Sequence, residues 1–360
     1  MKRILFMALC SGLLALSSCT VKNAAPQSSQ RWSQEKANAW YASQPWLVGC
    51  NYIPANAVNQ IEMWYKDTFS PDQIDKELVW AEGLGFNSLR VFLNSLVYEN
   101  DPDGMKERID KFLTLCHKHG IKPMLCLYDD CWNPESEYGL QPAPQPGVHN
   151  SGWLRDPTDS ARQDTLTLYP KMEKYVKDLL TTFGQDERVL LWDLWNEPGG
   201  QGYECATLPL LKKVFQFARE ANPSQPLTSG IWSQSPNFAP LNAFQLENSD
   251  VITYHTYAPL NVHSNMVNSL TMLNRPLLCT EYMARTLGSL FRDIMPYLKQ
   301  KKIAAYNWGF VAGKTNTIFA WGKPLPDQAE PEVWFCDIYR RDGTPFDQAE
   351  IDTIKSMTHR

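Results

Sequence analysis

Two glutamates end apolar segments of strand length, and their type and setting suit acid–base and nucleophilic chemistry. Glu197 follows the apolar run 192–195, and Glu281 closes the run 275–281. The carboxyl ends of parallel strands meet at one edge of a sheet, so two such glutamates predict a single site. Cleavage of a glycosidic bond needs one carboxyl as proton donor and another as nucleophile. The pair therefore favours glycoside hydrolysis over two unrelated surface carboxylates.

The chain must also supply the strands that carry this pair. Short apolar runs predict strands over 47–53, 88–93, 122–128, 189–195, 227–231, 251–257, 277–280 and 304–310. Amphipathic stretches between them predict helices over 71–85, 105–120, 169–183, 208–221, 239–246, 262–273, 287–301 and 347–357. Eight alternating units imply parallel pairing and predict an α/β fold, a single (β/α)8 TIM barrel.

An open, doubly wound sheet is the competing architecture. A phosphate-binding loop would favour it, but Gly83 and Gly85 lack a third glycine and precede a strand instead of following one. Pro71 and Pro170 are typical of the first turns of helices, which agrees with the barrel.

The segment 129–168, between the third strand and the next helix, is unusually long and rich in Pro, Gly and aromatic residues. Loops of this length are usually functional or disordered. On a barrel, this loop would follow a strand and therefore face the catalytic end. Its aromatic residues, Trp132, Tyr138 and Trp153, predict an ordered wall over the site.

The first residues predict a targeting segment. Lys2 and Arg3 precede the apolar run 4–16, and Cys19 follows it. This pattern is typical of a bacterial lipoprotein signal over 1–18, with Cys19 lipidated; an ordinary secretion signal is the alternative. We then expect a flexible tether over 19–31 and a catalytic domain over 32–360, attached to the outer membrane on its periplasmic or cell-surface side.

Composition narrows the remaining possibilities. The 360 residues are 43% hydrophobic and 20% charged, which is typical of a soluble globular domain. The net charge of −5 and the lack of a basic run make nucleic acid an unexpected partner. The nine cysteines include no CxxC pair, so no zinc site is predicted. A disulfide between Cys131 and Cys205 stays open.

Five short motifs together resemble the clan A glycoside hydrolases, and within that clan family 5, the cellulase and mannanase type. They are Asn-Ser-Leu-Arg at 87–90, Asn-Glu-Pro at 196–198, His-Thr-Tyr at 255–257, Glu281, and Asn-Trp at 307–308. The resemblance extends from about Trp46 to Trp321. Each motif alone is weak, but all five occur in order at the ends of the expected strands.

The resemblance implies a retaining mechanism, with the two carboxyls about 5–5.5 Å apart. Glu197 would be the acid/base, its pKa raised by apolar neighbours such as Trp195 and by the charge of Glu281. Glu281 would be the nucleophile, kept ionised by Arg90 and by the hydroxyl of Tyr257. A structural ion pair between Arg90 and the strand residue Asp193 is the alternative for Arg90.

The resemblance also implies substrate contacts. Asn196 would hold the sugar 2-hydroxyl, His255 would line the same rim, and Trp308 would be the platform beneath the sugar. Further candidates are Trp132, Trp153 and Trp321, and each of these aromatic residues could equally be core. Family 5 usually places a histidine at the end of the third strand, where this chain lacks one; the candidates to fill that place are His149 and Asp130.

The expected partner is a β-linked polysaccharide or oligosaccharide, with mannan, glucan and xylan all left open. No cofactor and no metal are implied, the membrane is contacted only through the lipid anchor, and a monomer is expected. A non-catalytic carbohydrate-binding lipoprotein on the same scaffold would not need both glutamates. A transglycosylase would use the same residues as a hydrolase. Metal hydrolases and serine esterases are disfavoured because HExxH and GxSxG are absent.

Overall fold

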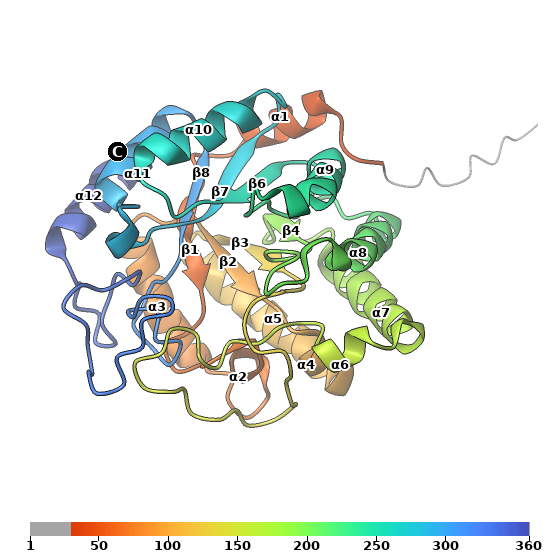
Figure 1. Cartoon of the computed structure of the whole chain (residues 1–360), viewed down its shortest axis with the longest axis horizontal. Coiled ribbons are helices and arrows are strands. Elements are labelled where there is room, and N and C mark those ends of the chain that lie inside the picture. The colour runs from red at the N-terminus through yellow and green to blue at the C-terminus, as the bar shows by residue number, and fades with distance from the viewer. Residues whose placement is uncertain (1–29, 360) are drawn as a thin grey trace, which may run out of the picture.

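The computed structural model describes residues 30–359 and confirms the (β/α)8 barrel (Figure 1). Eight parallel strands form one sheet in the order β5-β4-β3-β2-β1-β8-β7-β6, and a bridge between Ile231 and Tyr254 joins its two ends. The strands are β1 (Val48–Tyr52), β2 (Ser88–Phe92), β3 (Lys122–Cys126), β4 (Leu191–Asp193), β5 (Leu227–Thr228), β6 (Ile252–His255), β7 (Leu277–Tyr282) and β8 (Ala304–Asn307). All eight predicted strands are present, and Glu281 lies within β7, one residue before its end.

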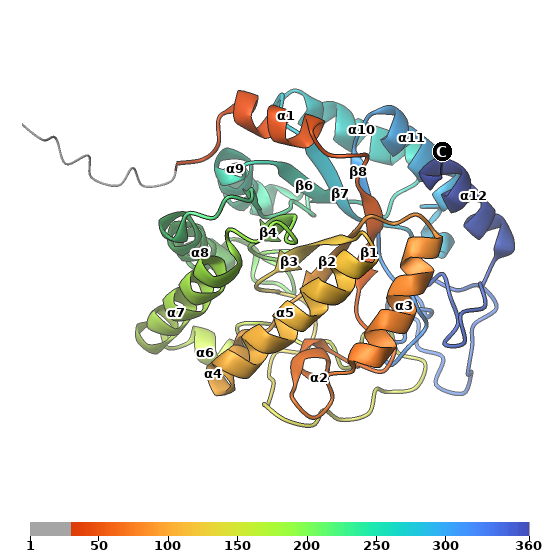
Figure 2. The ribbon, with the colours of Figure 1, turned by 180° about the vertical axis from the view of Figure 1, so that it is seen from behind.

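All eight predicted helices are also present and form the outer layer of the barrel (Figure 2). They are α3 (Pro71–Gly83), α5 (Pro102–Lys118), α7 (Thr165–Phe183), α8 (Leu208–Ala221), α9 (Ala239–Asn248), α10 (Leu260–Thr271), α11 (Phe291–Gln300) and α12 (Gln348–Thr358). Four short helices were not predicted: α1 (Gln34–Ala42), α2 (Gln60–Trp64), α4 (Ser95–Asn100) and α6 (Asp159–Arg162).

The expected place of Pro170 in a first turn is wrong. Asp164 caps α7 by accepting a hydrogen bond from the backbone N–H of Thr167, so the helix begins at Thr165 and Pro170 lies in its second turn. A capping carboxylate satisfies a free N–H at the start of a helix, which explains why the helix begins before the proline.

The two ends of the barrel interior differ in character. At the amino ends of the strands, a cluster of apolar side chains that includes Leu47, Leu191 and Tyr306 packs against Trp40 and Tyr41 from the region of α1. At the carboxyl ends, a second cluster contains aromatic and sulfur-containing side chains such as Trp153, Trp308 and Cys131, and the buried Glu281 lies near the same end of its strand. The end at the amino termini of the strands is therefore hydrophobic core. The end at their carboxyl termini is where a barrel can hold an active site.

The seam between β5 and β6 depends on Asp250, which is fully buried. Its carboxylate accepts hydrogen bonds from the backbone N–H groups of Trp32 (2.7 Å) and Leu227 (2.8 Å) and pairs with Arg219 at 2.7 Å. Arg31 donates to the carbonyl of Ser249 at 2.8 Å, so the end of the predicted tether already packs on the barrel.

The predicted signal over 1–18, the lipidation site Cys19 and most of the tether lie outside the described residues. Among residues 30–359, no helix is both long enough and apolar enough to cross a membrane.

Replacing Asp250 with Ala should lower the free energy of unfolding by about 3–5 kcal/mol, because Arg219 and two backbone donors would lose a buried acceptor. Urea unfolding followed by circular dichroism measures the loss. The exposed Glu187→Gln is the matched control and should leave the midpoint unchanged. Equal midpoints for Asp250→Ala and the wild type would contradict the role given to this carboxylate.

Candidate active site

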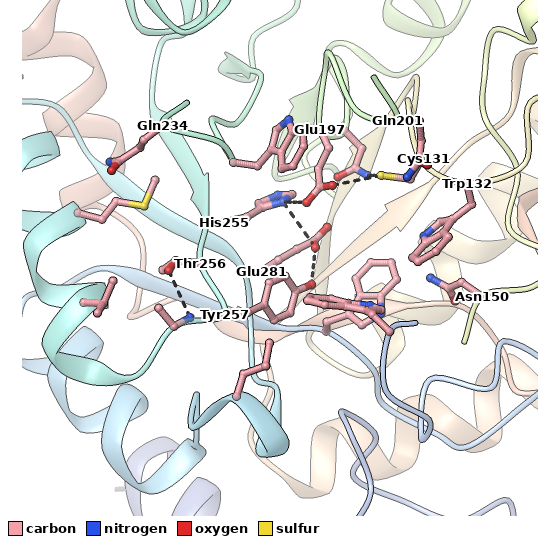
Figure 3. A pocket seen from close by; sticks show the side chains of 18 of the residues that line it. Cys131, Trp132, Asn150, Glu197, Gln201, Gln234, His255, Thr256, Tyr257 and Glu281 are labelled. Carbon is pink, nitrogen blue, oxygen red and sulfur yellow. Dashed lines mark hydrogen bonds and ion pairs between the residues drawn. The ribbon is translucent and has the colours of Figure 1, made fainter. Parts of the chain in front are cut away.

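A pocket of about 860 Å³ opens at the carboxyl ends of the strands, and both glutamates line it (Figure 3). The strands, or the turns directly after them, supply Asn196, Glu197, His255, Tyr257, Glu281 and Trp308. One wall comes from the loop between β3 and α7, which contributes Cys131, Trp132, Asn150 and Trp153. The opposite wall comes from α10 and includes Asn265 and Met266. The structure thus brings the two predicted carboxyls into one cavity, with the long loop beside them.

Glu281 is 4% exposed and both of its carboxylate oxygens are occupied. Arg90 Nη1 lies 2.7 Å from Oε1, and the hydroxyl of Tyr257 donates to Oε2 at 2.5 Å. Burial and the nearby Glu197 raise the pKa of Glu281, while Arg90 and Tyr257 act in the opposite direction. The predicted donors are therefore in contact with this carboxylate, but they offset only part of the effect of burial.

Arg90, on β2, is fully buried and pairs with both carboxylates that the sequence suggested for it, Glu281 and Asp193. Besides Glu281, its guanidinium pairs with Asp193 Oδ2 at 2.7 Å. It also donates to Asn51 Oδ1 at 3.0 Å and to Asn196 Oδ1 at 2.8 Å. One planar guanidinium therefore links side chains from β1, β2, β4 and β7 around the pocket.

Glu197 follows β4 with a backbone φ of 42°, in the left-handed region that non-glycine residues seldom adopt. His255 Nδ1 lies 2.9 Å from Oε1, and the thiol of Cys131 donates to Oε2 at 3.2 Å. Burial raises the pKa of Glu197 to about 6, against the effects of Cys131 and Arg90. The direction of the shift agrees with the prediction and burial is its main cause, but the charge that adds to it is that of Asp130, not the expected Glu281.

The two carboxyls lie close together. Oxygen atoms of Glu197 and Glu281 and a ring nitrogen of His255 all lie within 4.8 Å of one another. Burial lowers the pKa of His255 to about 4, so its imidazole is neutral. Arg90 and Tyr257 already occupy both oxygens of Glu281, so this carboxylate is engaged by partners within the protein.

The four predicted aromatic residues all line the pocket, at different depths. Trp308 is 8% exposed and packs edge-on against Trp153, with ring centroids 5.5 Å apart. Trp153 is only 2% exposed and donates through Nε1 to Asp129, so it mainly supports the other rings. Trp321 packs edge-on against Tyr257, and Trp132 lies on the loop wall.

Neither candidate for the missing histidine position lies in the pocket. Asp130 is fully buried and accepts hydrogen bonds from the backbone N–H of Gly199 and the hydroxyl of Thr207. His149 is also buried, between the carbonyl of Phe319 and the indole N–H of Trp321. The proposed sugar contacts of Asp130 and His149 are therefore wrong, because both side chains stabilise loops behind the site.

Sequence reasoning missed several lining residues, among them Cys131, Asn150, Gln201, Trp232 and Gln234. The thiol of Cys131 contacts Glu197, and within residues 30–359 all seven cysteines are free, so the Cys131–Cys205 disulfide does not form. The buried Oδ1 of Asn150 has no hydrogen-bond partner among the described residues. Of these residues, only Cys131 had a signal in the sequence, because the run 129–132 directly follows the predicted third strand.

The side-chain amide of Asn196 is already hydrogen-bonded within the protein. Its Oδ1 accepts from Arg90, and its Nδ2 donates to Asp129 Oδ1 at 2.8 Å. Asp129 also accepts from the backbone N–H of Cys131, and burial raises its pKa to about 7. The carboxylate of Asp129 thus connects the loop wall to the turn that carries Glu197.

A family model described as cellulase (glycosyl hydrolase family 5) matches residues 49–343. No curated protein matches the chain in a comparison of sequences.

Several solved structures are similar in fold. The exo-beta-1,4-mannosidase Op5Man5 from Opitutaceae bacterium strain TAV5 is 19% identical with a TM-score of 0.60; the match covers 87% of this chain and 60% of that one. GH5_18 from Streptomyces cattleya in complex with GlcNAc is 12% identical, with a TM-score of 0.59 over 87% and 80% of the two chains. The endo-1,4-beta-mannanase from Rhizomucor miehei is 12% identical, with a TM-score of 0.56 over 85% and 95%. At sequence identities this low, the structural similarity supports the barrel fold alone.

Replacing Arg90 with Met should cost about 3–5 kcal/mol of unfolding free energy at neutral pH, because Asp193 and Glu281 would be left buried without their cation. Without the cation, the pKa of Glu281, which burial already raises, would rise further above its unfolded value of about 4. The loss should therefore shrink as the pH falls towards about 4, where the unfolded carboxyls also take up protons.

Urea unfolding at the two pH values measures this effect. Arg292→Met, on an exposed arginine, is the control and should change little. A loss for Arg90→Met that does not depend on pH would indicate packing, not charge.

Proposed function

The chain belongs to glycosyl hydrolase family 5, and on that basis we propose that this glycoside hydrolase is a retaining β-glycosidase. Glu281 is its nucleophile and Glu197 its acid/base. The observation that carries the proposal is the close approach of the two carboxyls: one oxygen of Glu197 and one oxygen of Glu281 lie within 4.8 Å of each other. A retaining pair is about 5–5.5 Å apart, whereas an inverting pair leaves about 6.5–9.5 Å to admit a water.

In the first step, a carboxylate oxygen of Glu281 attacks the anomeric carbon as the bond to the leaving oxygen breaks. Glu197 gives its proton to that oxygen, and the alcohol departs. A covalent ester now joins the sugar to Glu281, and Glu197 is ionised. Because burial raises the pKa of Glu197 to about 6, a substantial share of this carboxyl carries the needed proton in mildly acidic solution.

In the second step, the ionised Glu197 takes a proton from a water, and the oxygen of that water attacks the anomeric carbon. The ester breaks, Glu281 leaves as a carboxylate, and the sugar keeps its original configuration after two inversions. Arg90 and Tyr257 hold the departing carboxylate through the contacts that they make in the free enzyme. Asn196 and His255 face the same cavity and support the sugar and the acid.

We propose β-linked, mannose-containing chains as the substrate class. Two of the structurally similar proteins are described as a β-1,4-mannosidase and a β-1,4-mannanase. In the pocket, the exposed parts of Trp308, Trp321 and Trp132 offer flat apolar faces for sugar rings. Lipidation of Cys19 and attachment to the outer membrane remain part of the proposal, supported by the pattern of residues 2–19.

Glu281→Gln should reduce hydrolysis of all substrates to background, because no nucleophile remains to form the ester. Glu197→Ala should lose about 10²–10⁴-fold in kcat/KM on glycosides with poor leaving groups. On a dinitrophenyl glycoside, whose leaving group needs no proton, Glu197→Ala should still form the glycosyl ester. Added azide should then attack this ester, restore turnover and give a glycosyl azide of retained configuration.

Rates from each variant and proton NMR of the azide product check this assignment. Glu247→Gln, an exposed carboxyl on α9, is the matched control and should retain full activity. Rescue of Glu281→Gln instead of Glu197→Ala would exchange the two roles, and a wild-type product of inverted configuration would overturn the mechanism.

The purified chain, residues 20–360, should release sugar from β-mannan or manno-oligosaccharides in a panel that also holds β-glucan, xylan and galactan. Glu281→Gln serves as the blank. Release from another polymer alone would overturn the mannose assignment. Tight binding without release in any sample would favour a binding protein over the enzyme.

A further inference from the structure

Cys131 lies in the pocket beside the carboxyl of the proposed acid/base. It is 8% exposed, lines the pocket, and places its Sγ 3.2 Å from Glu197 Oε2. His255 contacts the other oxygen of the same carboxyl at 2.9 Å. These two side chains therefore hold the acid/base carboxyl from both ends (Figure 3).

The thiol is itself fixed in place. Asp129 Oδ1 accepts a hydrogen bond from the backbone N–H of Cys131 at 2.8 Å. Asn196 Nδ2 lies 3.5 Å from Sγ and donates to it. Since the sulfur accepts on the side of Asn196, its own proton is directed to Glu197.

The thiol keeps that proton at the pH where the enzyme would work. Burial and the neighbouring Glu197 and Asp129 raise the pKa of Cys131 well above its usual value. A neutral S–H donor stabilises a carboxylate without adding a charge, unlike a protonated imidazole. Its contact lowers the pKa of Glu197, which burial alone would raise further.

We propose that Cys131 is a positioning residue for the acid/base Glu197. It orients Oε2 and stabilises the ionised carboxylate that must deprotonate water in the second step. The inference rests on the proposed function, because it assigns Cys131 a part in that reaction.

Other titratable and charged groups around the Glu197 carboxyl also influence its pKa. They are Arg90 from β2, Asp129 and Asp130 from the loop after β3, His255 and Tyr257 at the end of β6, and Glu281 from β7. Cys131→Ala removes the donor to Glu197 and also the acceptor of Asn196 Nδ2, whereas Cys131→Ser keeps both. A shift present in the Ala variant and small in the Ser variant is therefore assigned to these contacts of the thiol.

The test compares Cys131→Ala, which has no donor, with Cys131→Ser, which keeps one. Without the donor, the pKa of Glu197 rises. The alkaline limb of kcat/KM, which reports loss of the acid proton, should then move up by about half a unit to one unit in Cys131→Ala. On a dinitrophenyl glycoside, where the second step limits, kcat should fall by about 3–10-fold below that pKa, because less base is ionised.

Cys131→Ser should lie closer to the wild type in both measurements. Cys205→Ser is the matched control, because that half-exposed thiol donates to the carbonyl of Asn237 outside the pocket; it should leave both profiles unchanged. Coincident pH profiles for the wild type and Cys131→Ala, or equal shifts for the Ala and Ser variants, would overturn the proposal.

A second readout does not depend on turnover, so it separates this inference from the proposed function. The S–H stretching band of Cys131 is identified in the infrared spectrum by its loss in Cys131→Ser. The band should shift as Glu197 is titrated, and the shift should vanish in Glu197→Gln. A band that stays fixed across the titration would overturn the contact, even if the chain hydrolyses glycosides; a shifting band in a chain without activity would overturn only the catalytic assignment.

Discussion

The active site depends on one constraint: the guanidinium of Arg90 and the carboxylates of Asp193 and Glu281 share a volume that excludes water. An unpaired ion in such surroundings costs several kcal/mol, so one planar cation must meet two anions together. Arg90 does so at 2.7 Å on each side. Because the guanidinium has little freedom between them, the direction of Glu281 into the pocket is set by the register of β2, β4 and β7.

The two glutamates differ in their partners more than in their burial. Glu281 meets a cation and a phenol, both of which favour its charged form. Glu197 meets a neutral imidazole and a neutral thiol, and burial raises its pKa to about 6. Burial raises the pKa of both carboxyls, but only Glu281 meets a cation that favours its charged form, so the proposed mechanism assigns the transferable proton to Glu197.

The sequence predicted the barrel and the strand-borne part of the site, because strand ends can be located from local apolar runs. The loop residues were harder, since neighbouring residues in a turn point in different directions. In the run 129–131, Asp129 reaches Asn196, Asp130 turns towards the backbone of Gly199, and Cys131 faces the pocket. No pattern of residue types distinguishes these directions. They follow from the bridge between Asp129 and Asn196, which joins segments far apart in the chain.

The side chain of Asp129 also connects the loop wall of the pocket to the turn that carries Glu197. The carboxylate of Asp129 accepts from Trp153 Nε1 on the wall and from Asn196 Nδ2 beside Glu197. It also accepts from the backbone N–H of Cys131. Because all three donors share one fully buried carboxyl, a displacement of the loop changes the geometry of the turn that carries Glu197. The loop that lines the pocket and the turn that carries Glu197 are therefore coupled through Asp129.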